Sequence, residues 1–482
     1  MGQLRSLAGQ TAIYGVSSIL GRVINYLLVG LHTAIFLPEQ LGIVASLFAY
    51  TAIFLVIYTY GMETTFFRFA KDNLEKAYTS SCTVVIIIST VLSATIYFNS
   101  DFLAPLIGYP SAGKYIEWLA IILWIDAVLS IPFGRLRFEN KAKKFASIKI
   151  ANILINIGLQ FFFLLIIPSL DSSFEVTIGS IFLANLIANA LMVLMLYKEV
   201  IKIRFHWDKQ VMQTVFSYST PIFLMGLAGM MNEQLDKILI EHFLPDSYYK
   251  SMDSTAATGV YSQTFKLGVL MMLAVQAFRY AGEPFFFAQA DDKKAPELFA
   301  RVMHYFVIFG LLLFVLVSLN VDFIASIFLR QPEYRVALYL VPLILFGKLI
   351  YGVYLNLSIW FKITDKTRYG LYFSLIGLFV TLAGNVLLLP KIGLLGCAIS
   401  IICCYLSMSL VCYIIGQKHF PIPYNFTKLI PYAITAVVLV YMGELYQHPN
   451  FTIDTTINIV CSILITIVLW VIEKNKLSAG KL

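Results

Sequence analysis

Three basic side chains lie inside long apolar stretches of the 482-residue sequence: Arg22, Lys266 and Lys348. A lysine or arginine at the centre of a bilayer costs about 2.5 to 3.5 kcal/mol, so such residues usually face a cavity or a partner. At the rise of an α-helix, each cation lies roughly 14 to 18 Å from one end of its apolar stretch, close to the bilayer midplane. Three deep cations favour the binding of an anion.

Acidic side chains at the same depth are scarce. Asp126 is the one acid near the midplane, and Glu117 lies nearer the surface. One deep acid cannot neutralise three bases, which favours an anion-binding cavity over structural ion pairs between helices; such pairing stays open as the alternative. Asn25 lies on the same helical face as Arg22, opposite a stripe of leucine and valine, and is a further candidate for binding the anion.

Three residues are candidates for coupling and gating. Asp126 has the depth to take up a proton from one side of the membrane and release it when cations approach, and permanent pairing with a cation is the alternative. Arg279 and Glu283 are four residues apart, so we expect either an ion pair at a helix end, with Pro284 ending the helix, or a gate. A solvated outer helix face is expected from the charged residues Glu233, Asp236, Lys237 and Glu241.

The composition indicates which elements must position these residues. The sequence is 59% hydrophobic and 13% charged, and its mean hydropathy is +0.80. Soluble domains carry roughly 25% charged residues, so a soluble globular enzyme is excluded. The apolar residues form runs of about 20, the length of a helix that crosses roughly 30 Å of hydrocarbon. The sequence therefore predicts an all-α integral membrane protein with about 14 transmembrane helices.

An internal repeat divides these helices into two related six-helix lobes. It rests on short matches, among them Leu41–Ile43 and Thr258–Val260, which open the second and eighth helices. We expect residues 1–205 to form the first lobe, 206–420 the second, and 421–482 two added helices and a tail. The expected helices are 11–36, 41–61, 79–98, 115–133, 145–167, 176–196, 211–231, 257–280, 302–319, 336–359, 369–389, 392–415, 426–445 and 453–472.

The basic residues between the helices predict the orientation in the membrane. With the N-terminus inside, the cytoplasmic segments, Lys149 included, hold 26 of the 35 lysines and arginines. Both termini are therefore expected in the cytoplasm. The net charge of +8 reflects this topology and gives no reason to expect a nucleic-acid partner. The sequence has no nucleotide-binding loop, no hydrolase motif and no metal-ligand pattern, so we expect a transporter without cofactor or metal and not an enzyme.

Four stretches carry a resemblance to a known family. The sequences GRVINY (21–26), LDKILI (235–240), GVY (259–261) and AFRYAGEPFFF (277–287) resemble the signatures of the polysaccharide transporters, the O-antigen flippases of the multidrug/oligosaccharidyl-lipid/polysaccharide (MOP) exporter superfamily. The resemblance covers essentially the whole chain. It implies a two-lobed bundle of twelve helices with two added, which opens alternately to either side of the bacterial inner membrane.

The implied cargo is an undecaprenyl-diphosphate-linked oligosaccharide, an O-antigen or capsular repeat unit. The family's cationic cavity carries over to Arg22 and Lys266, whereas Lys348 rests on its depth alone. Besides membrane lipid, a glycan polymerase is an implied partner. Three other functions stay open: a lipid II flippase, a cation-coupled drug antiporter of the same superfamily, and a membrane-embedded polysaccharide polymerase. The antiporter would need an acidic cavity and twelve helices, and the polymerase a long outer loop.

Overall fold

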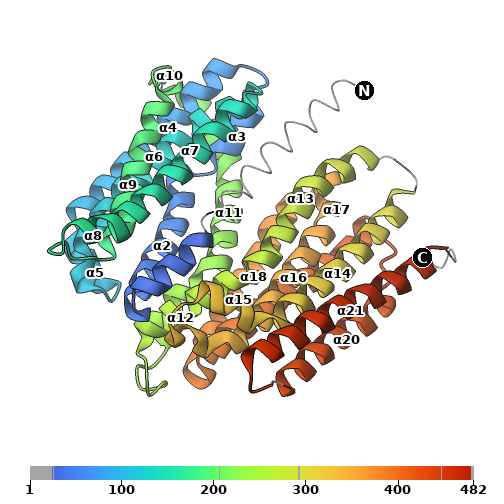
Figure 1. Ribbon diagram of the computed structural model, residues 1–482. Coiled ribbons are helices and arrows are strands. Elements are labelled where there is room, and N and C mark those ends of the chain that lie inside the picture. Colours follow the sequence, from blue (N-terminus) through green and yellow to red (C-terminus); the bar gives the residue numbers. More distant parts are fainter. Residues whose placement is uncertain are drawn as a thin grey trace. The chain divides into compact units, whose positions relative to one another are not determined.

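The computed structural model describes residues 24–478 except 25, 206, 291, 293 and 447, with the backbone alone at 281, 284 and 475–478. Within this part of the chain the secondary structure is helical, apart from one isolated β-bridge between Tyr249 and Met252 (Figure 1). An apolar helix at Tyr26–Ile35 is the described part of the first expected helix. The all-α prediction is confirmed.

The helices that follow differ in length from about one turn to the full thickness of a membrane. In chain order they are α2 (Pro38–Thr59), α3 (Met62–Phe69), α4 (Leu74–Phe98), α5 (Ser100–Leu106), the 3-10 helix η1 (Pro110–Ala112), α6 (Gly113–Phe138), α7 (Ala142–Phe161), the π-helix η2 (Phe162–Ile166), α8 (Ile167–Leu170), α9 (Gly179–Met195), α10 (Tyr197–Val200), α11 (Lys209–Phe243), α12 (Ser254–Leu267), α13 (Val269–Gln289), α14 (Ala295–Leu319), α15 (Val321–Phe328), the 3-10 helix η3 (Pro332–Leu340), α16 (Val341–Leu357), α17 (Ile359–Ile363), α18 (Arg368–Ile392), α19 (Leu394–His419), α20 (Phe426–Leu445) and α21 (Phe451–Ser478).

Each of the fourteen expected helices has a counterpart. Eleven segments of the described chain are long and apolar enough to cross a membrane. The other three expected helices correspond to the shorter apolar helices Tyr26–Ile35 and α9 and to the pair α12 and α13. Side-chain caps explain several helix starts, because Asp208, Asn73 and Asn425 accept hydrogen bonds from backbone N–H groups of the first turns of α11, α4 and α20.

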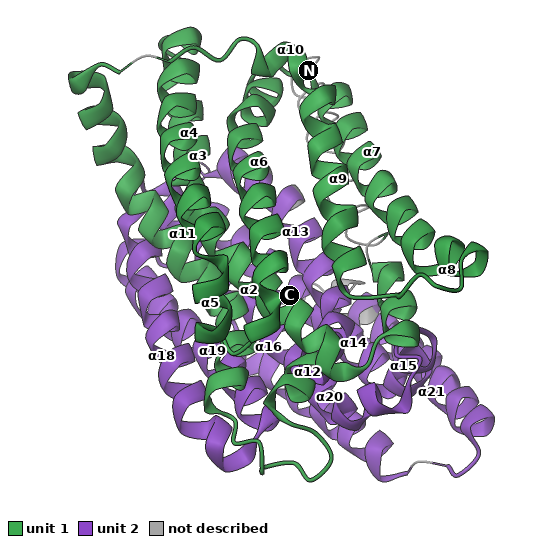
Figure 2. Ribbon diagram, turned by 90° about the vertical axis from the view of Figure 1, so that its left-hand side faces the viewer, with its two compact units in different colours: residues 1–259 green, residues 260–482 purple. Residues whose placement is uncertain are grey.

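The chain divides into two compact units, residues 1–259 and 260–482 (Figure 2). The expected lobe boundaries at 205/206 and 420/421 stay predictions. Compact units are defined by contacts between segments, whereas the lobes are defined by a repeat in the sequence, so the units do not test the lobes.

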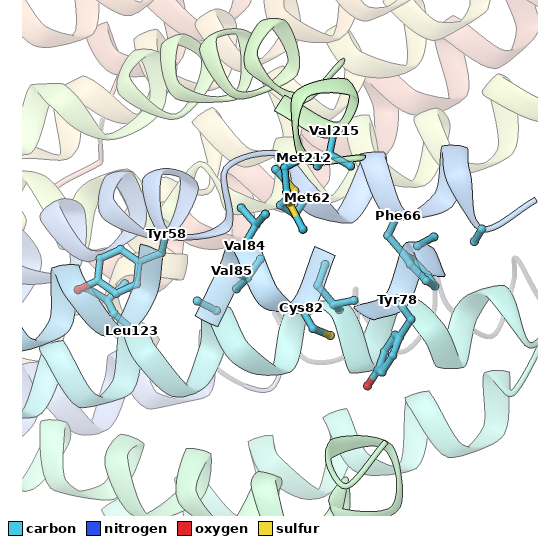
Figure 3. Close-up of a cluster of buried hydrophobic side chains, with 14 residues drawn as sticks. Tyr58, Met62, Phe66, Tyr78, Cys82, Val84, Val85, Leu123, Met212 and Val215 are labelled. Atoms are coloured by element: carbon cyan, nitrogen blue, oxygen red, sulfur yellow. The ribbon is translucent and has the colours of Figure 1, made fainter. Parts of the chain in front are cut away.

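The first unit has its main apolar core where α2 and α3 meet α4, α6 and α11. Tyr58, Met62 and Phe66 are fully buried there, against Tyr78 of α4 and Leu123 of α6 (Figure 3). Between α2 and α3 the backbone turns through left-handed conformations at Tyr60 (φ 47°) and Gly61 (φ 68°). Because of this turn, the 32-residue apolar segment Pro38–Phe69 consists of two helices with different axes. Both helices contribute side chains to the same core.

Two glycines bring α2 and the start of α12 into backbone contact. A Cβ atom at Gly42 would lie 2.9 Å from the carbonyl carbon of Thr255, and one at Gly259 would lie 2.8 Å from that of Pro38. The contact is reciprocal, since each glycine approaches the residue four positions before the other. These are the two glycines that the repeat matches, and no side chain fits between the helices at this point.

We expect Gly259→Ala to destabilise the protein strongly. The new methyl group would meet backbone and not a flexible side chain, so the overpacking cost is expected to reach at least about 2 kcal/mol. Thermal unfolding of the purified protein in detergent measures the effect. Gly158→Ala is the matched control, because a Cβ atom there meets nothing within 4 Å. Equal melting temperatures for the two variants would contradict the close contact.

The second unit is built around α16 and α19. The side chains of Trp360, Phe373 and Met408 are buried in its core together with Tyr354 and Tyr405. The last two helices, α20 and α21, pack against α14, and Figure 1 shows the three side by side. This unit holds two of the three cations singled out in the sequence.

Candidate functional site

Lys348 lies near the middle of the Pro332–Ile363 span, as its depth in the sequence predicts. Its side chain is only 3% exposed, and its Nζ lies 4.6 Å from the centre of the Phe265 ring and 5.9 Å from that of Tyr405. Aromatic faces are attractive to an ammonium ion in a site from which water is excluded. The site therefore places a lysine amine deep inside the second unit.

Lys266 belongs to the same region, because its neighbour Phe265 forms part of the site of Lys348. Its Nζ donates to Oε1 of Gln263 over 2.9 Å, and the side chain is half-buried. Lys266 stands in the last turn of α12, just before the helix is interrupted at Gly268. The sequence predicted one continuous helix over 257–280, which is wrong at this point.

The interruption at Gly268 has a packing reason. A Cβ atom at this glycine would lie 2.8 Å from the side chain of Ile344, so α16 approaches the chain closely here. The same approach brings Lys348 of α16 onto Phe265. Interrupted membrane helices often line the binding sites of transporters, because the break frees backbone groups within the membrane. Lys348 thus lies on the ring of Phe265, the residue before Lys266, next to this helix break.

Arg22 and Asn25 lie outside the described residues. Their assignment to the anion site stays a prediction from the sequence.

In the first unit, Asp126 lies in a polar cluster formed by three helices. Nδ2 of Asn189 on α9 donates to Oδ1 of Asp126 over 3.1 Å, and Nδ2 of Asn152 on α7 donates to Oδ1 of Asn189 over 3.1 Å. The cation that acts on Asp126 is Lys149 of α7. Lys149, which the topology prediction counts with a cytoplasmic segment, lies about two turns into α7, which begins at Ala142.

The cluster continues along α7 as a stripe that sequence analysis missed. Lys149, Asn152, Asn156 and Gln160 follow one another at spacings of three and four residues and so share one helix face. Gln160 donates to Asn156 over 2.8 Å, and its Oε1 lies 2.6 Å from Nε2 of buried His32. The spacing of polar residues in an otherwise apolar helix was the available signal.

Glu283 forms an ion pair with a lysine of another helix and not with Arg279. Nζ of Lys362 on α17 lies 2.5 Å from Oε1 of Glu283, whereas the Arg279 guanidinium lies over the ring of Tyr280 at 5.5 Å. The helix does not end at Pro284 either, because α13 continues to Gln289. The pair therefore ties α13 to α17, and a gating role for Arg279 and Glu283 stays a prediction.

The expected solvated face at the end of α11 is buried at Asp236 and Lys237 and half-buried at Glu233 and Glu241. Asp236 and Lys237 are 3% and 7% exposed. Glu241 accepts hydrogen bonds from the hydroxyl groups of Tyr109 (2.9 Å) and Thr255 (2.8 Å), beside the contact between Gly42 and Gly259. The prediction was wrong because α11 runs on to Phe243, beyond its expected end at 231, and packs along α2.

Comparison with known proteins gives the family. Residues 34–277, half of the chain, match the sequence profile of a family described as polysaccharide biosynthesis protein. The chain belongs to this family. Residues 247–387 of this polysaccharide biosynthesis protein also match the profile of the MatE family. No curated protein sequence matches the chain.

Solved structures agree on the fold. The lipid II flippase MurJ in its inward closed conformation superposes with a TM-score of 0.76 at 14% identity, over 97% of this chain and 99% of MurJ. A multidrug resistance MATE family transporter of the MOP superfamily in an inward-facing conformation gives 0.61 at 14% identity, over 84% and 94% of the two chains. A mutant of the Vibrio cholerae MATE transporter VcmN gives 0.58 at 15% identity, over 86% and 96%. The protein is a multi-pass membrane protein with the flippase and transporter fold of the MOP superfamily.

Proposed function

We propose that the protein is a flippase that moves an undecaprenyl-diphosphate-linked oligosaccharide across the bacterial inner membrane by alternating access. The observation that carries this proposal is the helix break of a polysaccharide biosynthesis protein at which Lys348 lies on the ring of Phe265, the residue before Lys266. A diphosphate is a multiply charged anion that hydrocarbon rejects, and cations already in place lower that barrier. Arg22 is proposed to complete the set.

The two lysines favour this cargo over a cationic drug. A drug antiporter would need acidic side chains where this chain has Lys266 and Lys348. The solved MATE transporters also cover 84% and 86% of the chain, against 97% for MurJ. This difference suits a protein with two helices beyond the twelve-helix core.

A lipid II flippase is the second candidate, favoured by the superposition with MurJ. The cargo of either candidate function contains a diphosphate, so the cations do not discriminate between the two functions. The experiment must therefore vary the glycan. Full-length protein in proteoliposomes should expose a labelled undecaprenyl-diphosphate oligosaccharide on the opposite leaflet faster than protein-free vesicles do. Labelled lipid II is the comparison cargo. Movement of lipid II alone would replace the proposal by the second candidate, and movement of neither would reject both.

Reporter fusions test the proposed orientation. From the distribution of basic residues we expect both termini in the cytoplasm. Fusions after Gly416 and Lys476 should therefore give a cytoplasmic signal, and a fusion near Pro449, in the turn between α20 and α21, an external one. The reverse pattern would invert the topology and place the loop before α7 outside.

A further inference from the structure

The second unit contains a cavity of about 800 Å³ between α14, α20 and α21. Its walls are mostly aliphatic, with Leu311, Val315, Leu439 and Leu464 among them. On α20 the wall extends from Lys428 to Leu439, a rise of about 16 Å. This is about half of the hydrocarbon thickness of roughly 30 Å, so the cavity is one leaflet deep.

One end of this cavity adjoins a smaller, charged pocket of about 240 Å³. The two share His304 and Lys428, and the smaller pocket adds Glu297, Arg301 and Asn425. It therefore presents both signs of charge, two cations and an acid, within the first two turns of α14 and the first turn of α20. An apolar cavity that ends in charges of both signs is complementary to a lipid with an acyl chain and a zwitterionic headgroup.

Polar side chains from the three helices gather at this junction. The hydroxyl of Tyr432 on α20 donates to Oε1 of Glu473 on α21, and Oε2 of Glu473 lies 4.0 Å from Nε2 of His304 on α14. Glu473 and His304 are 8% and 9% exposed. The cavity thus has a fixed polar boundary where its aliphatic walls end.

We propose that this site binds a membrane phospholipid whose headgroup carries both a phosphate and an amine. An acyl chain would occupy the aliphatic cavity, Arg301 and Lys428 would contact the phosphate, and Glu297 would contact the ammonium group. The depth of one leaflet suits an acyl chain, whereas an eleven-unit prenyl chain is longer than a single leaflet. In the expected topology this lipid belongs to the cytoplasmic leaflet.

Native mass spectrometry of full-length protein, extracted from membranes that contain phosphatidylethanolamine and phosphatidylglycerol, tests the site. Retained phosphatidylethanolamine should exceed phosphatidylglycerol by about fivefold relative to their ratio in the membrane, as one favourable charge contact provides. Glu297→Gln, at an exposed position, should return the ratio to that of the membrane. Replacement of both Arg301 and Lys428 by Gln should lower the retention of both lipids.

Leu439→Trp should fill the cavity and abolish retention. Val437→Trp is its control, since this exposed side chain on the same helix is not part of the cavity wall. Lys418→Gln, at an exposed position on α19, is the control for the loss of a positive charge. If Leu439→Trp does not fold, the lipid ratio retained by Glu297→Gln tests the proposal by itself.

Four results would overturn the proposal: a retained ratio equal to that of the membrane, a preference for phosphatidylglycerol, retention of undecaprenyl phosphate in place of phospholipid, or equal retention by the two tryptophan variants. Lipid retention is measured without transport. Failure of the proposed cargo would therefore leave this result unaffected.

Discussion

Lys348→Met is expected to reduce glycan export strongly while the protein remains folded and inserted. Methionine fills nearly the same space against Phe265 and Tyr405 and removes the charge alone. A hydrogen bond to a charged group contributes about 1.5 to 3 kcal/mol, so each cation that contacts the diphosphate should account for roughly a 10- to 100-fold change in transport. Lys266→Gln should act in the same way, and so should Arg22→Gln.

Surface polysaccharide on cells and transport in proteoliposomes are the two measurements. Lys266→Arg and Lys348→Arg should retain part of the activity, because they keep the positive charge in a bulkier side chain. Lys418→Gln controls for the loss of a lysine elsewhere on the protein and should transport normally. Full export by both Lys266→Gln and Lys348→Met would reject the role of the two lysines in the second unit.

Asp126→Asn is expected to leave downhill movement of the cargo intact and to remove its dependence on a proton gradient. Asparagine retains an acceptor for Asn189 but cannot exchange a proton. Lys149 of α7 lies within electrostatic range of Asp126. A proton taken up by Asp126 would therefore change the charge balance between α6 and α7, which is the proposed coupling step.

Purely structural pairing makes a different prediction for the same residues. Breaking a buried pair by removing one partner costs about 3 to 5 kcal/mol, so Lys149→Met alone should lower protein abundance. The double variant with Asp126→Asn should restore that abundance if pairing is the whole role. Asp171→Asn, in an exposed loop, is the control for loss of an acid. Unchanged gradient dependence in Asp126→Asn would exclude this residue from coupling.

The sequence alone predicted the helices well because a bilayer restricts what a spanning segment can be. Within hydrocarbon each backbone polar group must be paired inside its own helix, so length and hydropathy decide where spans occur. The cost of an unshielded charge likewise made Lys348 and Asp126 conspicuous by depth alone. These inferences need no knowledge of which helices are neighbours.

The partners of those charges depended on tertiary contacts. Lys149 acts on Asp126, Lys362 pairs with Glu283, and Lys348 lies on the ring next to Lys266, although the members of each pair are at least 23 residues apart. Hydropathy is a property of one segment, whereas a contact depends on the packing of two, so no local pattern predicted these pairs. The break at Gly268 and the partial burial of Glu241 have the same origin, since both follow from the close approach of another helix. Sequence thus determined which helices form and how deep their charges lie, and packing decided which side chains those charges meet.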